Sequence, residues 1–383
     1  MNIESLHVEN FKSIRELDVE FSNLNVFVGR NAAGKSNLFE VFQFLRDARS
    51  EGIEDAIQLQ GGVEYLRNTR IGIQRNLCIG LKMAVEVESG GSHESPEKET
   101  SNIKAELQFD EDTYDFKYDI DYPPSSEGDI AQSSVEMNNY SIERIAQNST
   151  ESAAEGPSAI EVIDGYDPDA RRYHQIGKTF DIDPRKITTD NSLAARTDLQ
   201  PDGSNLALVI KKLLEDKERK RKFLSLVSDV LPFISDTKVD AMPDQSLFLQ
   251  ILENFDPDED QYIPAEMLSD GTLRVLALIY ILYFSDHEKV FIEEPGRNIH
   301  PSLIANLMMK VKDAAENTDK QIFLTTHNVE VVKYAPLESI RLVSRDDDGF
   351  TQVEKPAESE RVQTFLDEGV RIDDMYTENL LGE

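Results

Sequence analysis

Cysteine is nearly absent from this chain: Cys78 is the single cysteine among 383 residues, so no disulfide can form within it. Long hydrophobic runs are missing too, since the longest one, from Val275 to Phe284, is too short to span a bilayer. The first residues do not contain a basic stretch followed by an apolar one, which a secretory signal would require. These absences predict a soluble, cytoplasmic protein without a membrane partner.

Positive charge is scarce, with 40 lysines and arginines against 73 aspartates and glutamates and a formal net charge of −33. The acidic residues are spread along the chain, which favours adaptation to high salt, where ions screen the repulsion; an ordinary acidic protein is the alternative. Such a charge opposes non-specific binding to nucleic acid. The one dense basic cluster, Lys211 to Lys222, is interpreted as a helix whose charges either face solvent or bind DNA or a protein partner.

The chain is organised around Gly29-Arg30-Asn31-Ala32-Ala33-Gly34-Lys35-Ser36, which fits the phosphate-loop pattern G-x-x-x-x-G-K-[ST]. The apolar run Leu24 to Val28 predicts a buried strand before the loop, and the spacing of apolar residues after Ser36 predicts a helix. Glycines let backbone N–H groups approach phosphates, and the helix N-terminus adds a positive dipole end. A glycine turn before an ordinary helix is the alternative. The residues assigned to ATP are Asn31, Ala32, Ala33, Gly34, Lys35, Ser36 and Asn37, with Lys35 on the β- and γ-phosphates and Ser36 on Mg²⁺.

Two later segments supply acidic and basic groups that phosphate chemistry needs. Val290 to Ile292 predicts a buried strand that ends in Glu293 and Glu294. We expect Glu293 beside Mg²⁺ and Glu294 to orient or deprotonate the attacking water; a solvated loop is the alternative. His327 follows a second buried strand, Ile322 to Leu324, and would hydrogen-bond the γ-phosphate, although a single histidine is usually structural.

A third segment, Leu268-Ser269-Asp270-Gly271-Thr272, directly precedes a strongly apolar helix. Ser269, Gly271 and the following backbone N–H groups would form a second helix N-terminus that binds phosphate. Ser-Asp-Gly is also a common cap and turn, which is the alternative. His300-Pro301 predicts the cap of the next helix.

Hydrophobic spacing predicts the remaining elements. The predicted strands cover 1–28 with a turn at Asn10 to Ser13, then 71–87, 103–120, 247–252 and, as the last one, 339–344. The predicted helices cover 37–48, a stretch from Leu206 onward, 272–284 and 329–334. Loops are predicted at 89–102, 123–128 and 148–158, a break at Gly61-Gly62, and a turn at Asp346 to Asp348.

In this order the motifs resemble those of ABC-class ATPases, and more narrowly the SMC/RecF/OLD-related group of "AAA family" ATPases. Val8 to Ile14, Gly29 to Asn37, Leu268 to Arg274 and Ile292 to Pro295 carry the narrower match. The resemblance implies an α/β P-loop NTPase fold, an ABC-type ATPase head with a mixed sheet lobe and a helical signature lobe. It also implies conversion of ATP and water to ADP and phosphate, with Lys12 near the nucleotide; a plain turn at Lys12 is the alternative.

The resemblance further implies an ATP-gated dimeric clamp, in which Ser269 of each head completes the site of the other. A role in DNA repair or recombination is the first hypothesis for such a clamp. The ATPase subunit of an anti-phage defence system, controlling a separately encoded nuclease or toxin, is the second, and a non-hydrolysing ATP switch is the third. OLD-type relatives carry a nuclease domain after the head, but fewer than sixty residues follow His327, so none is expected here.

The resemblance divides the chain into lobes and also shows departures from the group. The predicted parts are a sheet lobe at 1–87 and 286–350, a strand-rich insertion with flexible acidic loops at 88–185, a helical lobe at 186–285 and an acidic tail at 351–383. Glu293 stands where ABC proteins usually have an aspartate, and Asp270 stands where the signature motif LSGGQ has its first glycine. Gly296-Arg297-Asn298 stands where many relatives have an acidic residue. Candidates for the glutamine that links the lobes are Gln58, Gln60 and Gln74.

Overall fold

The computed structural model describes residues 2–71, 75–87, 97–109, 113–121, 132–141, 176–189, 198–242, 246–254 and 262–381. The chain forms two compact units that each combine distant segments. The first unit contains Met1–Ser22, Gly29–Gly177 and Val343–Glu354, and the second contains Asn23–Val28, Lys178–Leu342 and Lys355–Glu383. Within the described ranges, no helix has both the length and the apolar character needed to cross a membrane.

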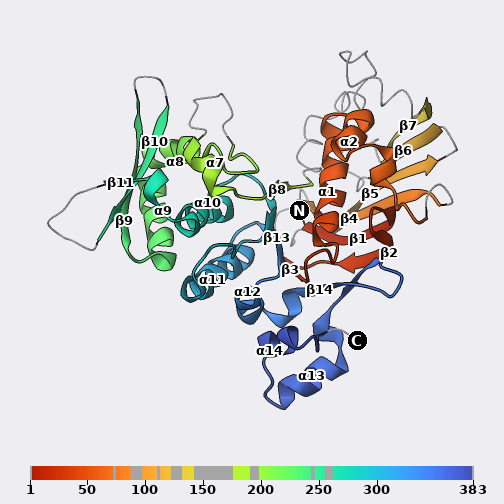
Figure 1. The fold of residues 1–383 in the computed structure, drawn as a ribbon. Coiled ribbons are helices and arrows are strands. Elements are labelled where there is room, and N and C mark those ends of the chain that lie inside the picture. Colours follow the sequence, from red (N-terminus) through yellow and green to blue (C-terminus); the bar gives the residue numbers. More distant parts are fainter. Residues whose placement is uncertain are drawn as a thin grey trace. The chain divides into compact units, whose positions relative to one another are not determined.

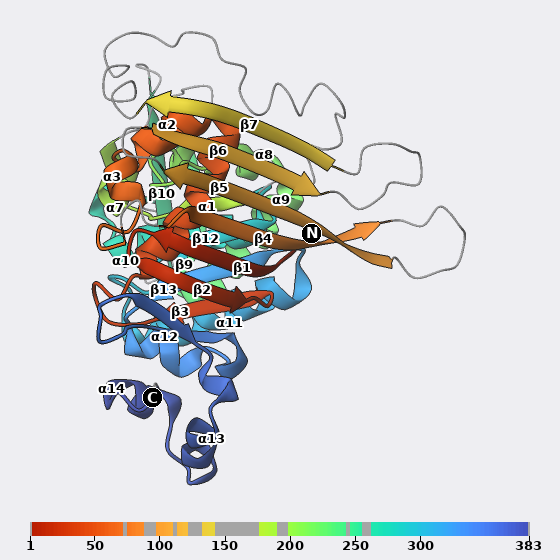
Figure 2. The same ribbon diagram turned by 90° about the vertical axis from the view of Figure 1, so that its right-hand side faces the viewer.

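The first unit is built on an antiparallel sheet with the strand order β2-β1-β4-β5-β6-β7, whose strands lie side by side in Figure 2. The strands are β1 (Asn2–Phe11), β2 (Ile14–Glu20), β4 (Leu77–Val87), β5 (Glu97–Phe109), β6 (Thr113–Asp121) and β7 (Gln132–Ser141). Leu17 and Val19 on β2 are buried and their neighbours are not, which confirms the alternation expected for a half-buried strand.

Helix α1 (Lys35–Ser50) follows the phosphate loop and packs through aromatic side chains. The Phe44 ring lies 6.1 Å from that of Phe11 on β1, and the Phe42 ring lies 6.0 Å from that of Phe21 after β2. Two short helices come next, α2 (Ile53–Leu59) and α3 (Val63–Leu66). Gly61-Gly62 separates them, as predicted, with both glycines at positive φ.

The second unit is centred on parallel strands in the order β14-β3-β13-β12-β8. These are β14 (Ile340–Arg345), β3 (Leu24–Val28), β13 (Gln321–Thr326), β12 (Lys289–Glu293) and β8 (Lys178–Phe180). Neighbouring residues of these strands, which point to opposite faces, are all buried, as expected for parallel strands with both faces covered: Val26, Ile292 and Leu324 on one face, and Phe27, Phe291 and Phe323 on the other. Strand β15 (Thr351–Glu354) follows β14 in the strand order and, like Val343 to Arg345 of β14, belongs to the first unit.

Helices lie beside this parallel sheet and share an apolar core with it in the second unit (Figure 1). They are α7 (Pro184–Thr189), α8 (Leu206–Glu215), α9 (Lys217–Val230), α10 (Asp270–Tyr283), α11 (Pro301–Asn317) and α12 (Val329–Tyr334). Helix α10 is buried almost all round, from Gly271 to Leu282. A small antiparallel sheet joins β9 (Ile234–Ala241), β10 (Leu247–Glu253) and β11 (Tyr262–Pro264). The 3-10 helix η2 (Ala265–Met267) leads into Leu268 to Thr272, here called the signature segment.

The last part of the second unit forms short helices around a small separate apolar cluster. The elements are η3 (Leu337–Ser339), η4 (Pro356–Glu358), α13 (Glu360–Asp367) and α14 (Ile372–Thr377). The cluster contains Val362, Met375 and Leu381. Residues 351–383, predicted as an acidic tail, therefore hold a strand and packed helices.

Three predictions about individual elements are wrong. Residues 339–344 are not the last strand, because β15 follows and pairs with β14. The turn between the two strands lies at Asp346 to Asp348, as predicted. The expected loop 89–102 ends earlier, because β5 begins at Glu97 and pairs with Val87 of β4. The basic cluster is not one helix, because Asp216 interrupts it in an extended conformation and caps α9 by accepting from the N–H groups of Glu218 and Arg219.

Other predictions concern residues that the structure does not describe. The expected loops at 123–128 and 148–158, and Gln74, lie outside the described residues. The division into sheet lobe, insertion, helical lobe and tail remains a proposal.

Candidate functional site

In the first unit, the lysine of the phosphate loop is hydrogen-bonded to backbone carbonyl oxygens of the same loop. Gly34 has a φ of 108° and precedes Lys35, the first residue of α1. The Lys35 ammonium donates to the carbonyl oxygens of Gly29 at 2.7 Å and Arg30 at 3.1 Å, and the side chain is buried. A buried cation beside the N-terminus of a 16-residue helix fits a bound phosphate, because both favour negative charge there.

Other residues of the predicted phosphate set lie around the same turn. Asn31, Ala32 and Ser36 are exposed, whereas Ala33 is buried. The exposed Ser36 hydroxyl lies on the first turn of α1, a position from which it can reach a Mg²⁺ ion that accompanies a nucleotide. Among the residues that the structure describes, no group of three histidine, cysteine or acidic side chains forms a ready-made metal site.

Two glycines of the loop lie against the hairpin that β14 and β15 form. A Cβ atom added to Gly29 would be 2.3 Å from the carbonyl oxygen of Val343. A Cβ atom added to Gly34 would be 2.1 Å from Oγ1 of Thr351. Packing against this hairpin thus favours glycine at both motif positions, which the motif alone does not reveal.

Lys12, predicted near the nucleotide, lies at the turn between β1 and β2 with a φ of 46°. Its ammonium donates to Glu40 Oε2 at 2.8 Å and to Gln60 Oε1 at 2.7 Å. Its carbonyl oxygen accepts from Asn68 Nδ2 at 2.6 Å. The turn is therefore anchored to α1 and to the segment after α3, and Gln60, a candidate linking glutamine, contacts the predicted nucleotide lysine.

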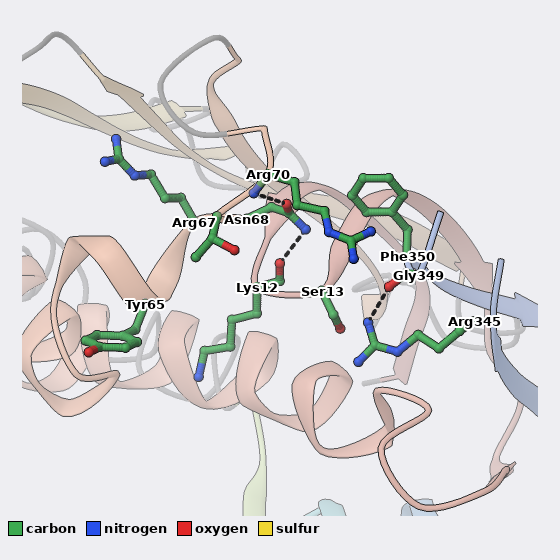
Figure 3. Close-up of a pocket in the computed structure, with 10 residues that line it drawn as sticks. Lys12, Ser13, Tyr65, Arg67, Asn68, Arg70, Arg345, Gly349 and Phe350 are labelled. Atoms are coloured by element: carbon green, nitrogen blue, oxygen red, sulfur yellow. Dashed lines mark hydrogen bonds between the residues drawn. The ribbon is translucent and has the colours of Figure 1, made fainter. Parts of the chain in front are cut away.

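A pocket of about 260 Å³ opens beside this turn in the first unit (Figure 3). Figure 3 shows the Lys12 side chain pointing toward the helix, while Arg70 and Arg345 converge on the Gly349–Phe350 side. Burial and the neighbouring Arg70 lower the pKa of Arg345, which still stays charged at neutral pH. The lining residues are Lys12, Ser13, Tyr65, Arg67, Asn68, Thr69, Arg70, Arg345, Gly349 and Phe350. Sequence analysis missed most of this wall, because its members come from three distant segments.

In the second unit, the carboxyl ends of three parallel strands carry the other predicted groups. Strand pairing sets Glu293 opposite Thr325, and Thr326 opposite Val28, the residue before the loop. Glu294 follows with a φ of 45°, and its Oε1 lies 2.7 Å from Nδ1 of His327. The two residues assigned to catalysis therefore contact each other.

The signature segment caps a helix, as its sequence predicts. Ser269 Oγ accepts from the N–H of Thr272 at 3.1 Å, at the start of α10. A Cβ atom on Gly271 would be 2.5 Å from the carbonyl oxygen of Asn298, so this glycine permits close packing. Asn298 Nδ2 also donates to Asp270 Oδ2 at 3.1 Å. The unusual residues at 296–298 therefore support the signature directly.

Two arginines near the signature were not assigned a role from the sequence. Arg274 on α10 is 2 % exposed, and burial, followed by the charge of Arg297, lowers its pKa. Arg297 forms an ion pair with Asp181. His300 accepts from the N–H of Ser302 at the start of α11, which confirms the predicted cap.

Comparisons with known proteins agree with this architecture. A segment of 65 residues is 42% identical to the DNA replication and repair protein RecF of Lactobacillus acidophilus, covering 16% of this chain and 17% of that protein. A segment of 51 residues is 47% identical to RecF of Halalkalibacterium halodurans, covering 13% and 14%. The chain therefore matches less than a fifth of the length of these relatives.

A solved structure matches over nearly the whole chain. The SMC head bound to the C-winged helix domain of ScpA superposes with a TM-score of 0.56 at 14% identity, covering 92% of this chain and 98% of that one. The fold is thus that of an α/β P-loop ATPase head related to SMC and RecF proteins. Residues 24–333, most of the chain, match one family model, so the chain belongs to the family described as "AAA domain, putative AbiEii toxin, Type IV TA system".

Proposed function

We propose that this chain binds ATP with Mg²⁺ and hydrolyses ATP to ADP and phosphate as an ATP-gated dimer. The observation that carries the proposal is the parallel register of β12, β13 and β3 in the second unit. The carboxyl ends of these strands continue along the chain into Glu294, His327 and the phosphate loop. Ligands of α/β sheets bind at the carboxyl ends of the strands.

In the proposed reaction, the loop residues hold the phosphates and Lys35 exchanges its two carbonyl partners for phosphate oxygens. Ser36 and Glu293 would hold Mg²⁺, which neutralises phosphate charge when bound. Glu294 orients the attacking water and accepts its proton. His327 is within hydrogen-bond distance of Glu294 and so orients that carboxylate. Its proposed role towards the nucleotide is a hydrogen bond to the γ-phosphate.

The base and ribose of the nucleotide are assigned to the pocket beside Lys12. Phe350 offers an aromatic face, and the guanidinium groups of Arg70 and Arg345 offer hydrogen-bond donors. Lys12 would contact the phosphates from the same wall. This assignment accounts for a group of cations gathered in one pocket of a strongly acidic protein.

The proposal is tested by comparing Lys35→Ala and Glu294→Gln in ATP-binding and phosphate-release assays. Lys35→Ala should lose nucleotide affinity, because the loop loses its cation. Glu294→Gln should bind ATP normally and hydrolyse it at least about 100-fold more slowly, because the water loses its proton acceptor. Glu330→Gln is the matched control, since this carboxylate pairs with Lys333 on α12. Hydrolysis by Glu294→Gln at the unaltered rate would contradict the assigned role.

The process that this ATPase drives has two candidates. The RecF segments support a clamp on DNA, for which the basic cluster on α8 and α9 is the proposed contact. The family description names a toxin–antitoxin system, which supports control of a separately encoded effector protein. We place DNA first, because the basic cluster is a physical feature of this chain itself.

A further inference from the structure

The phosphate loop is held by a hairpin far away in the sequence. The hairpin consists of β14, the turn at Asp346 to Asp348, and β15. Its Thr351 lies 318 residues after Ala33, and its Arg345 lies 313 residues after Ala32. The contacts between hairpin and loop all lie within the first unit.

Thr351 is fully buried and links three parts of the site. Its Oγ1 donates to the carbonyl oxygen of Ala33 at 3.3 Å and lies 2.7 Å from Oγ of Ser13. The Ser13 hydroxyl also accepts from Asn37 Nδ2 on α1. The same Thr351 side chain occupies the space that a Cβ atom of Gly34 would need. One hydroxyl therefore joins the loop, the β1–β2 turn and, through Ser13, the first turn of α1.

Arg345 makes the second contact with the loop. Its Nε donates to the carbonyl oxygen of Ala32 at 3.0 Å, and its guanidinium donates to the carbonyl oxygen of Gly349 at 2.8 Å. The turn that carries Gly349 is itself closed by Asp346, whose carboxylate accepts from the N–H of Phe350 at 2.8 Å. This hydrogen bond is the main cause of the lowered pKa of Asp346, and it keeps the carboxylate charged.

We propose that Thr351 and Arg345 are positioning residues, which hold the phosphate loop in its nucleotide-binding conformation before ATP arrives. Both side chains donate to loop carbonyl oxygens, and the N–H of Ala33 donates to the carbonyl oxygen of Arg30, so the peptide groups on both sides of Ala33 are held in place. Ala32 has a φ of 64°, which is unfavourable for a residue with a side chain and requires support from its surroundings. The inference rests on the proposed function, because it concerns the conformation that binds ATP.

Positioning and mere structural support predict different kinetics. If only a fraction of free molecules has a competent loop, the apparent dissociation constant rises by the inverse of that fraction. Bound phosphates then hold the loop themselves, so the turnover of the bound complex is preserved. A purely structural defect would instead lower the amount of active protein and leave KM unchanged.

The test compares Thr351→Val, which keeps the shape and removes the hydroxyl, with Thr351→Ser, which keeps the hydroxyl. Thr351→Val should raise KM for ATP about tenfold with kcat within about twofold, and Thr351→Ser should restore KM to within about threefold. Glu354→Gln is the matched control on the same strand, because the Glu354 side chain is exposed. Its KM should equal that of the unaltered protein.

Hydrogen exchange of the backbone amides of residues 29–37, without nucleotide, provides a readout that does not depend on ATP. Thr351→Val should accelerate this exchange about tenfold, and Glu354→Gln should not change it. If Thr351→Val does not fold, Arg345→Gln is judged by the same exchange measurement, with the same acceleration expected.

The outcomes separate the two proposals. Unchanged KM and unchanged loop exchange in Thr351→Val, while Lys35→Ala still abolishes ATP binding, would overturn the positioning role alone. Failure of the unaltered protein to bind ATP would overturn the proposed function, and accelerated exchange would then still support the hairpin contact. A fall in kcat at constant KM would also overturn positioning.

Discussion

Three residues of the candidate site have backbone conformations that normally favour glycine. In the described part of the chain, the residues with positive φ other than glycine and asparagine are Lys12, Ala32 and Glu294. Such a conformation costs an ordinary residue about 1–2 kcal/mol. Local strain of this kind concentrates at functional sites, where the surroundings hold it in place. All three residues had been assigned to the nucleotide or to catalysis on other grounds, so their backbone strain supports that assignment independently.

At the residue scale, Gly34→Ala should abolish ATP binding and destabilise the protein. The new Cβ atom would be strained by the φ of 108° and would also collide with Thr351. Gly52→Ala is the control, since Gly52 has a φ of 95° but no atom near the added Cβ, so only backbone strain is introduced. Thermal unfolding and ATP titration of both variants measure the difference. Equal loss of stability in the two variants, with ATP still bound by Gly34→Ala, would disprove the packing argument.

At the element scale, the break at Asp216 changes how the basic cluster is presented. Lys211 and Lys212 lie in the second half of α8, whereas the remaining basic residues lie in the first half of α9. Part of the cluster is engaged within the protein: Lys220 pairs with Asp236 at 2.9 Å, and Lys222 lies over the rings of Tyr283 and Phe284. Basic residues at a helix N-terminus are also unfavourable for the helix dipole, so α9 depends on its cap and its packing.

If DNA is the partner, it should bind these two helices in the ATP-bound Glu294→Gln protein. The exposed residues Lys212, Lys217 and Arg221 are changed together to glutamine, and binding to duplex and single-stranded DNA is measured across a salt series. Affinity should fall steeply with salt, because phosphate contacts release counterions, and the triple variant should show a shallower slope. In the control, three scattered lysines, Lys312, Lys333 and Lys355, are changed to glutamine, which removes the same total charge. DNA binding that is equal in both triple variants would remove the basic cluster from consideration.

At the scale of the whole molecule, the proposed clamp requires two copies of this chain. Ser269 of the signature segment caps helix α10, and the N–H groups at the start of this helix would contact ATP bound by another subunit. A net charge of −33 opposes association of two copies, so the proposed dimer needs the specific contacts that each signature segment would make with nucleotide bound by the other copy. Dimerisation should therefore follow ATP occupancy.

Light scattering of Glu294→Gln with and without ATP tests this expectation. ATP should convert the monomer into a dimer that persists, because hydrolysis no longer removes the nucleotide. Ser269→Arg should bind ATP and stay monomeric, since the new side chain blocks phosphate from another subunit. Lys35→Ala should stay monomeric because it lacks ATP. A Glu294→Gln protein that is monomeric with confirmed bound ATP would refute the clamp.

The sequence by itself determined the local parts of this protein. Gly29 to Ser36, the apolar strand before Glu293 and the Ser269 cap were readable, because each depends on neighbours within a few residues. Helix α12 and strands β12 and β13 lie where periodicity predicted them. Errors arose where pairing with another segment decided the outcome, as at the start of β5, or where a single capping residue split a helix, as at Asp216.

Only the tertiary structure decided which distant residues share one site. Thr351 and Arg345 carry no local signal, because their role depends on contacts with a loop more than 300 residues earlier. The pocket wall likewise combines the β1–β2 turn, the segment after α3 and the β14–β15 hairpin. The contact between Glu294 and His327 follows from the parallel pairing of β12 with β13. Local sequence determines propensity and turn chemistry, whereas strand register and packing select the partners.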